Sequence, residues 1–180
     1  MPDDSALASR VASGDRDALR VLYERHAERV WRVARRHLGN DADAEDVTQA
    51  VFLGLMEGAR QFRPEARFTT WLYRVTANRC LNHRALAHER LRDGLDTVPE
   101  AALVARAEDQ PDRLIETRER EAAVLAALAR LPERQRLAVV LSRFDGLSYE
   151  EIAEAMQCSV STVESLLFRA RQGLRKMLTS

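Results

Sequence analysis

The sequence has little cysteine, glycine and proline, and it has no long apolar run. Two cysteines in 180 residues, Cys80 and Cys158, cannot form a disulfide framework, so the composition favours a reduced, cytoplasmic protein. No segment approaches the ~20 apolar residues that a membrane span needs. The acidic N-terminus is not followed by the apolar stretch of a secretory signal. We therefore expect no membrane insertion.

Strand signals are also scarce. Runs that alternate between apolar and polar residues are absent, whereas apolar residues recur at helical spacing along much of the chain. The hydrophobic content of 46% and the charged content of 31% are typical of a globular protein and argue against wholesale disorder. The predicted fold class is all-α.

The N-terminal half contains three predicted helices. The first has an apolar stripe that ends before Gly39, made of Leu19, Leu22, Tyr23, His26, Val30, Val33 and Ala34. The second should begin in the acidic segment 41–46, which suits a helix N-terminus, and run to about residue 60. Residues 61–69 include Pro64 and should form a loop, and the third helix should run from about residue 70 to residue 87 or beyond.

The C-terminal half contains four predicted helices. One should span residues 112–130, and the next should have Pro132 at its first position and end near Gly146. Two sequences have the spacing of a capping box, Ser148 to Glu151 and Ser161 to Glu164, and each should open a further helix. The last helix should bury a stripe made of Val163, Leu167, Ala170, Leu174 and Met177 or Leu178.

Between the two halves the helical periodicity fades. Residues 92–111 contain Gly94, Pro99, Pro111 and many acids, which is typical of a linker, although 101–107 could form a short helix. The predicted organisation is therefore two small helical domains, 1–91 and 112–180, joined by an acidic linker over 92–111.

The net charge is zero, but the charge alternates in blocks along the chain. Residues 16–37, 60–92 and 163–176 carry net charges of +4, +6 and +3, whereas residues 38–59 and 93–116 carry −5 each. Each block could meet a different partner, or it could be an ordinary solvated helix face.

The strongest motif is a helix-turn-helix between Leu147 and Arg175. A short helix, a tight turn at 158–161 and a second helix have its spacing, and the small Ala153 suits the point where the helices cross. Ile152, Val160, Val163 and Leu167 should fill the wedge between them. In such motifs the N-terminal residues of the second helix reach base edges in the major groove. The candidates here are Ser161, Thr162, Ser165, Phe168, Arg169 and Gln172. A helical hairpin with solvated arginines is the alternative.

Four segments resemble motifs of bacterial sigma factors, the promoter-recognition subunits of RNA polymerase. They are Asp43–Phe52 (DAEDVTQAVF), Phe68–Asn78 (FTTWLYRVTAN), Gly146–Ala153 (GLSYEEIA) and Ser161–Arg171 (STVESLLFRAR). Their order and spacing are similar to those of the extracytoplasmic-function type, which keeps only regions 2 and 4. The resemblance assigns residues 1–91 to region 2 and residues 112–180 to the helix-turn-helix of region 4.

The resemblance implies that the acidic helix binds core RNA polymerase. In the family this helix docks on the basic clamp helices of the largest subunit, which fits the −5 block, and region 4 meets the flap. The implied polymerase-binding residues are Asp43, Glu45, Asp46, Gln49 and Phe52. An N-terminal capping or solubilising role is the alternative for these acids. The resemblance also implies an anti-sigma factor that masks both functional faces until a signal arrives.

The resemblance further implies that the +6 block captures and melts the minus-ten element. Arginines neutralise phosphates, and aromatic faces and amides suit an unstacked base. The implied residues are Arg63, Arg67, Phe68, Trp71, Tyr73, Arg74, Asn78, Arg79 and Asn82. For Trp71 a place in the core is the competing interpretation.

Region 4 would read the minus-thirty-five element through its second helix. Two residues depart from the family pattern: Glu164 stands where Lys or Arg is common, and Leu166 stands where Arg is common. A capping box would give Glu164 a local role, but the preferred upstream sequence stays open.

Two other classes of function compete with this interpretation. A conventional helix-turn-helix repressor or activator would bind DNA without polymerase, but the first half would then have no reason to carry sigma motifs. Cys80, His83 and His88 have spacings that could supply three zinc ligands, but no fourth ligand is evident. No phosphate-binding loop or catalytic triad is present, so we expect no enzyme activity, catalytic residue, metal or cofactor. Both cysteines are expected to be small buried residues.

Overall fold

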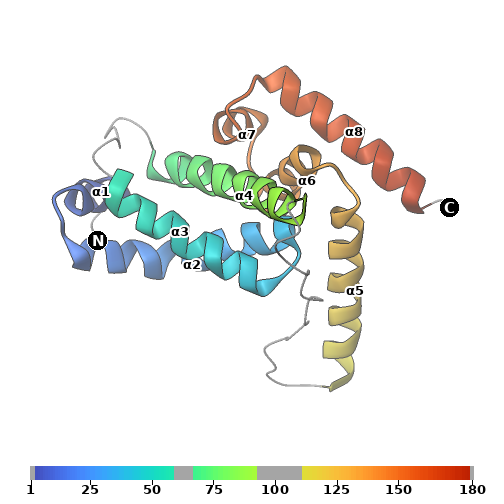
Figure 1. Cartoon of the computed structure of the whole chain (residues 1–180), viewed down its shortest axis with the longest axis horizontal. Coiled ribbons are helices and arrows are strands. Elements are labelled where there is room, and N and C mark those ends of the chain that lie inside the picture. Colours follow the sequence, from blue (N-terminus) through green and yellow to red (C-terminus); the bar gives the residue numbers. More distant parts are fainter. Residues whose placement is uncertain (1–2, 59–66, 93–110, 179–180) are drawn as a thin grey trace.

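The structure is a computed structural model, and it describes residues 3–58, 67–92 and 111–178. Within these ranges every regular element is helical, as the sequence predicts (Figure 1). None of the helices in the described part of the chain combines the length and the apolar character that crossing a membrane requires.

Four helices form the N-terminal body: α1 (Asp4–Ala12), α2 (Arg16–Leu38), α3 (Asp41–Gly58) and α4 (Phe68–Arg92). Their apolar stripes meet in a core that includes Leu7, Leu22, Val51, Leu55 and Leu72. The predicted stripe on α2 is largely buried, and the helix ends at Gly39, whose φ of 92° favours a residue without a side chain. Helix α1 was not predicted, and α4 begins two residues earlier than expected.

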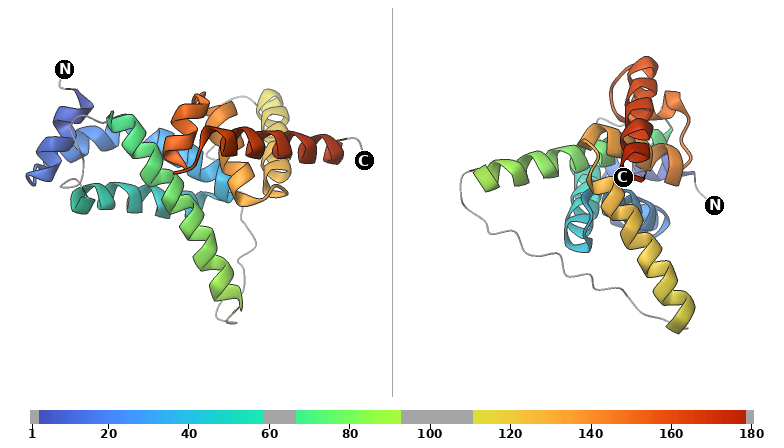
Figure 2. Two further views of the ribbon diagram at one scale, coloured as in Figure 1. Left: turned by 90° about the horizontal axis from the view of Figure 1, so that it is seen from above. Right: turned by 90° about the vertical axis from the view of Figure 1, so that its right-hand side faces the viewer.

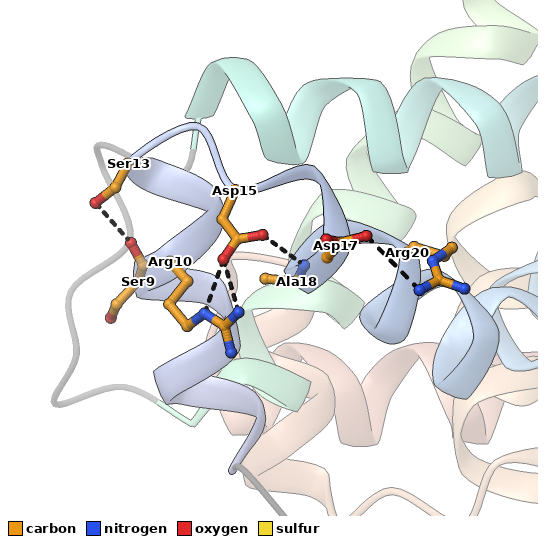
Figure 3. Close-up of polar contacts among 7 residues, drawn as sticks. All are labelled: Ser9, Arg10, Ser13, Asp15, Asp17, Ala18 and Arg20. Atoms are coloured by element: carbon orange, nitrogen blue, oxygen red, sulfur yellow. Dashed lines mark hydrogen bonds and ion pairs between the residues drawn. The ribbon is translucent and has the colours of Figure 1, made fainter.

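The turn between α1 and α2 is held by Asp15, the N-cap residue of α2 (Figure 3). One carboxylate oxygen of Asp15 accepts the Ala18 amide at 3.0 Å, and the other accepts two Arg10 nitrogens at 2.9 and 2.7 Å. The Ala18 amide and the Arg10 guanidinium both lower the pKa of Asp15. The carboxylate thus caps α2 and fixes α1 against its start.

The C-terminal body begins with α5 (Pro111–Ala129), which the predicted helix 112–130 matches closely. It continues with α6 (Glu133–Val139), a π-helical segment (Val140–Phe144), α7 (Tyr149–Ala155) and α8 (Val160–Leu178). Pro132 is the N-cap residue of α6 and not its first helical residue. A second core lies among these helices and includes Leu137, Leu141, Ile152, Val163 and Leu167.

Helices α7 and α8 have the predicted helix-turn-helix arrangement, with one capping box confirmed and one wrong. The Glu151 amide donates to Ser148 Oγ at 3.2 Å, and the Ser148 amide donates to Glu151 Oε2 at 2.8 Å. At the start of α8, however, Ser159 is the cap, since its Oγ accepts the Thr162 amide at 3.2 Å. The predicted box from Ser161 to Glu164 starts two residues too late.

Two smaller expectations about this motif are corrected. Val160 was expected in the wedge between the helices, but it is the first residue of α8 and is exposed. Cys158 is half-buried against the second core, whereas Cys80 is fully buried as expected.

The two bodies are in contact, which the sequence analysis did not anticipate. Helix α7 lies beside α4, while α4 and α5 project from the molecule in different directions (Figures 1 and 2). Val33 of α2 and Ala77 of α4 belong to the second core. Arg136 joins the bodies, because its buried guanidinium donates to His37 O at 2.9 Å. It also donates to the carbonyls of Leu128 and Ala129 at the end of α5 and of Leu131 just after it.

Candidate functional site

The acidic helix α3 presents a continuous outer face. Glu45, Asp46 and Gln49 are exposed there, and the face continues into two apolar side chains, Leu53 and Met56, which are 62% and 45% exposed. Exposed large apolar side chains beside acids are typical of a surface that binds a partner. Three of the predicted polymerase-binding residues thus share an accessible surface, and Leu53 and Met56 extend it.

The other two predicted members of this surface have partners inside the protein. Asp43 accepts from His83 Nε2 at 2.9 Å and from the Asn40 amide nitrogen at 2.7 Å. Phe52 is buried, and Tyr23 of α2 covers it with the ring centroids 4.9 Å apart. Tyr23 is itself 46% exposed, so it presents an aromatic edge where the sequence predicted Phe52.

Sequence reasoning missed Tyr23, Leu53 and Met56, although a signal for two of them was readable. Leu53 follows Glu45 by eight residues and Asp46 by seven, and Met56 follows them by eleven and ten. These are close to multiples of the helical repeat, so both apolar residues lie on the polar face of α3. An apolar residue on a polar face is the pattern of a contact surface. Tyr23 was assigned to the buried stripe of α2, and the sequence around it gives no sign that Tyr23 lies at the exposed edge of that stripe.

Helix α4 buries the two aromatic residues that begin the predicted minus-ten surface. Phe68 and Trp71 belong to the first core, with ring centroids 6.0 Å apart, and the ring of His26 lies 5.3 Å from Phe68. The competing interpretation of Trp71 as a core residue matches its position. The same holds for Phe68, which the sequence analysis placed in the preceding loop.

Tyr73 lies on a different side of α4, against the C-terminal body. Its hydroxyl donates to Asp145 Oδ2 at 2.6 Å, and a pocket of about 210 Å³ between the bodies opens beside this pair. Burial, reinforced by the Asp145 carboxylate, raises the pKa of Tyr73. Tyr73, Ala77 and Leu81 recur every four residues and together form the face of α4 that meets the second core.

The remaining polar side of α4 is accessible. Arg67 precedes the helix and is exposed, as are Asn78, Arg79 and Asn82, and Arg74 is half-buried. Arg79 reaches α3, because a Cβ added at Gly54 would meet its Nη2 at 3.2 Å. Arg63 lies outside the described residues. The predicted minus-ten residues therefore divide into a buried pair, an interface tyrosine and a polar exposed set.

Helix α8 shows no such division. Ser161, Ser165, Phe168, Arg169 and Gln172 are exposed on its outer side, and Thr162 is half-buried beside the cap. The opposite side carries Val163, Leu167 and Ala170, which are buried. Positive charge continues to the end of the helix with Arg171, Arg175 and Lys176. All six predicted minus-thirty-five residues thus lie on one surface.

The zinc hypothesis finds no geometric support in the residues that the structure describes. Cys80 lies in the first core, where burial raises the pKa of its thiol to about 12, whereas His83 is paired with Asp43. The His88 side chain is outside the described part. Among the described side chains no three His, Cys, Asp or Glu residues are grouped so that they could hold a metal ion.

Two family models match the chain, one in each body. The model of Sigma-70 region 2 matches residues 22–90, and the model of Sigma-70 region 4 matches residues 121–174. The first match covers most of α2, all of α3 and most of α4, and the second covers α7 and most of α8.

Curated relatives match over nearly the whole chain. RNA polymerase sigma-H factor of Pseudomonas aeruginosa is 34% identical, with 97% of this chain and 93% of the relative covered. ECF RNA polymerase sigma-E factor of Escherichia coli (strain K12) is 33% identical, with 95% of this chain and 92% of the relative covered.

Solved structures share the fold. CnrH, in complex with the cytosolic domain of CnrY, is 26% identical with a TM-score of 0.71, and 98% of this chain and 97% of that chain are covered. The sigma factor RpoE from Bartonella quintana, in complex with the anti-sigma factor NepR, is 21% identical with a TM-score of 0.70, and 89% and 96% are covered.

Proposed function

The chain belongs to the sigma-70 family of RNA polymerase sigma factors, in its extracytoplasmic-function group, and from this premise we propose how its surfaces divide the work of initiation. Helix α3 binds core polymerase, α4 engages the minus-ten element, and α8 reads the minus-thirty-five element. The observation that carries the proposal is the presence, on one chain, of an exposed acidic and apolar face on α3 and an exposed recognition face on α8. A polymerase subunit acts in the cytoplasm, which agrees with the localisation that we expect from the composition.

The polymerase-binding surface is centred on Glu45, Asp46 and Gln49. Exposed carboxylates attract a basic partner and guide its approach. Leu53 and Met56 add apolar area that becomes buried on contact, which supplies affinity that exposed charges alone do not. Asp43 has a local role in this proposal, since it links the start of α3 to α4 through His83.

The minus-ten surface consists of Arg67, just before α4, and the exposed polar residues of α4. Arg67 and Arg79 neutralise phosphates, and the amides of Asn78 and Asn82 suit the edges of an unpaired base. Phe68 and Trp71 act as supports that hold the start of α4 in place. This assignment narrows the set that the sequence proposed to residues that DNA can reach.

The minus-thirty-five surface consists of the outer side of α8. Arg169 can bond guanine or phosphate, Phe168 can contact a thymine methyl group, and Ser165 and Gln172 can bond base edges. Arg171, Arg175 and Lys176 add charge along the backbone.

The two DNA surfaces must separate before both elements can be bound. Elements centred at minus ten and minus thirty-five lie about 85 Å apart at about 3.4 Å per base pair. A compact chain of this length has a radius of gyration of only about 16 Å. We infer that the contact between α4 and α7 opens on the promoter, which exposes Tyr73 as a further candidate for base stacking.

Control by an anti-sigma factor is also proposed. A sigma factor of the same fold has been solved with the anti-sigma factor NepR. A protein that covers the exposed face of α3 or holds the two bodies together would block the steps above.

Run-off transcription with core RNA polymerase on genomic promoter fragments tests the proposed function. The chain should yield discrete transcripts that Asp46→Arg abolishes. Asp17→Arg is the matched control, because Asp17 is an equally acidic, exposed residue on α2 and outside the α3 face. Equal activity of the two variants would contradict the role of α3. Sequence-specific DNA binding by the chain alone, without transcripts, would instead favour a polymerase-independent repressor.

A further inference from the structure

The acid near the start of the recognition helix, Glu164, has no partner within the described residues that accounts for it. Ser159, and not Ser161, caps α8, so Glu164 is the fifth residue of the helix and lies beyond the third position that a capping box uses. The cap is completed by Ser159 Oγ, which lies 2.8 Å from Thr162 Oγ1 and 2.9 Å from Ser161 Oγ. Ser159 thus caps α8 without Glu164.

Glu164 also lacks an ionic partner on its own helix. The residues three and four positions away, where a helix places an ion-pair partner, are Val160, Ser161, Leu167 and Phe168. Glu164 is exposed, and within the described residues no hydrogen bond or ion pair involves its carboxylate. It therefore remains available to an external ligand.

The position of Glu164 places it inside the DNA-reading surface. At helical spacing it lies on the same side as Ser161 and Phe168, and Phe168 is 58% exposed. The charged residues that follow on α8 are all basic, namely Arg169, Arg171, Arg175 and Lys176. A single carboxylate in this setting is repelled by phosphates, so it weakens binding unless a base supplies a hydrogen-bond donor.

Base chemistry then selects the ligand. A carboxylate only accepts hydrogen bonds, and the major-groove donors are the amino groups of cytosine N4 and adenine N6. Adenine places its N7 acceptor beside that donor, and guanine presents only acceptors, so both repel a carboxylate. Cytosine is the base whose edge fits.

We propose that Glu164 reads a cytosine in the upstream promoter element and thereby sets the sequence preference of this sigma factor. The inference rests on the proposed function, because it takes α8 as the helix that enters the major groove. The contact strengthens binding when cytosine stands at one position and weakens it when another base stands there. The arginines of α8 supply the sequence-independent attraction.

Run-off transcription with the holoenzyme on a promoter pool with randomised upstream bases tests this proposal. The natural chain should enrich cytosine at one position. Glu164→Gln should lower that preference roughly 5- to 100-fold and move it towards adenine, whose donor and acceptor pair matches an amide. Glu154→Gln is the matched control, since it removes the same charge from an exposed residue of α7 and should leave the base profile unchanged.

Two other results would overturn the proposal. If Glu164→Gln raises the use of all sequences equally, the carboxylate only repels phosphate; if it lowers all of them equally, the residue contacts polymerase. A parallel selection of DNA by the full-length protein at low salt, without polymerase, separates this question from the proposed function. Cytosine enrichment there that Glu164→Gln removes supports the contact even if the transcription assay fails, and an unchanged profile refutes it.

Discussion

Helices α4 and α8 both carry side chains that were predicted to contact DNA, but they occupy different places in the fold. Helix α8 lies at the edge of one core. Its single apolar stripe faces that core, and its other side is exposed. Helix α4 lies between two cores, so Phe68 and Trp71 face the first and Tyr73 and Ala77 face the second. The residues predicted to contact DNA therefore lie together on one exposed side of α8, whereas on α4 they are divided between two cores and the exposed side.

The difference shows when an aromatic residue indicates a binding site. On an edge helix, an aromatic outside the apolar stripe has no core to fill, so the exposure of Phe168 points to a ligand. On a central helix both sides have cores, and an aromatic residue there is first a packing residue. Variants that separate packing from binding on the two helices can test this distinction.

The largest expected contrast is between Trp71→Ala and Phe168→Ala. Trp71 is 7% exposed, so truncating it should lower the free energy of unfolding by about 3–5 kcal/mol. Phe168→Ala should change that free energy by less than about 0.5 kcal/mol and should instead reduce transcription from promoters with a preferred upstream element. Urea denaturation and run-off transcription measure the two effects.

The milder Trp71→Phe variant keeps this contrast testable if Trp71→Ala does not fold. It should retain most of the stability and nearly all of the minus-ten activity. A stable Trp71→Phe protein that fails to melt promoters would show that Trp71 contacts DNA, and the distinction between the helices would then be wrong.

A second, smaller effect is expected at Arg136, which stabilises the contact between the bodies. Arg136→Met removes four hydrogen bonds to carbonyls, three at or just after the end of α5 and one at His37. Since buried acceptors would lose a charged donor, the free energy of unfolding should fall by about 2–4 kcal/mol. Arg134→Met is the control, because Arg134 is exposed on the same helix, and it should have little effect in the same denaturation experiment.

The helices themselves were largely predictable, because periodicity marks α2, α3, α5, α7 and α8, and helix-end residues mark the end of α2 and the start of α7 correctly. Helix α1 was missed since its stripe of Leu7, Ala8 and Val11 is short. The contact between the bodies was missed although Tyr73, Ala77 and Leu81 form a second apolar stripe on α4. Of these three residues only Tyr73 was assigned a role from the sequence, a contact with DNA, and the sequence does not say which body a second stripe meets.

A smaller loss of stability than that of Arg136→Met is expected when the hydrogen bond between Tyr73 and Asp145, which links the two bodies, is removed. Tyr73→Phe removes the donor to Asp145 and should lower the free energy of unfolding by about 1–2 kcal/mol. Tyr149→Phe is the control, since within the described residues no hydrogen bond involves that hydroxyl, and it should have no comparable effect. Equal losses in the two variants would show that the bond contributes nothing specific.

The same bond should make stability depend on pH in the alkaline range. Because the folded protein raises the pKa of Tyr73, its contribution is complete below the unfolded pKa of about 10 and is lost as the pH rises beyond it. The natural chain should therefore lose more stability than Tyr73→Phe when the pH is raised above about 10. Parallel pH dependences in denaturation curves would contradict this coupling.

The last test compares α4 with the turn before α8 without substituting a core residue. It measures the reactivity of the cysteine in each region. Cys80 of α4 is fully buried and burial raises its pKa to about 12, whereas Cys158 in the turn before α8 is half-buried. Since the thiolate is the reactive form, a thiol reagent near neutral pH should label Cys158 in the native protein and Cys80 only after unfolding. Mass spectrometry should show one rapid label per chain, and none in Cys158→Ser. Rapid labelling of Cys80 would mean that α4 leaves its core readily, and α4 would then resemble the accessible helix α8 more than its packing indicates.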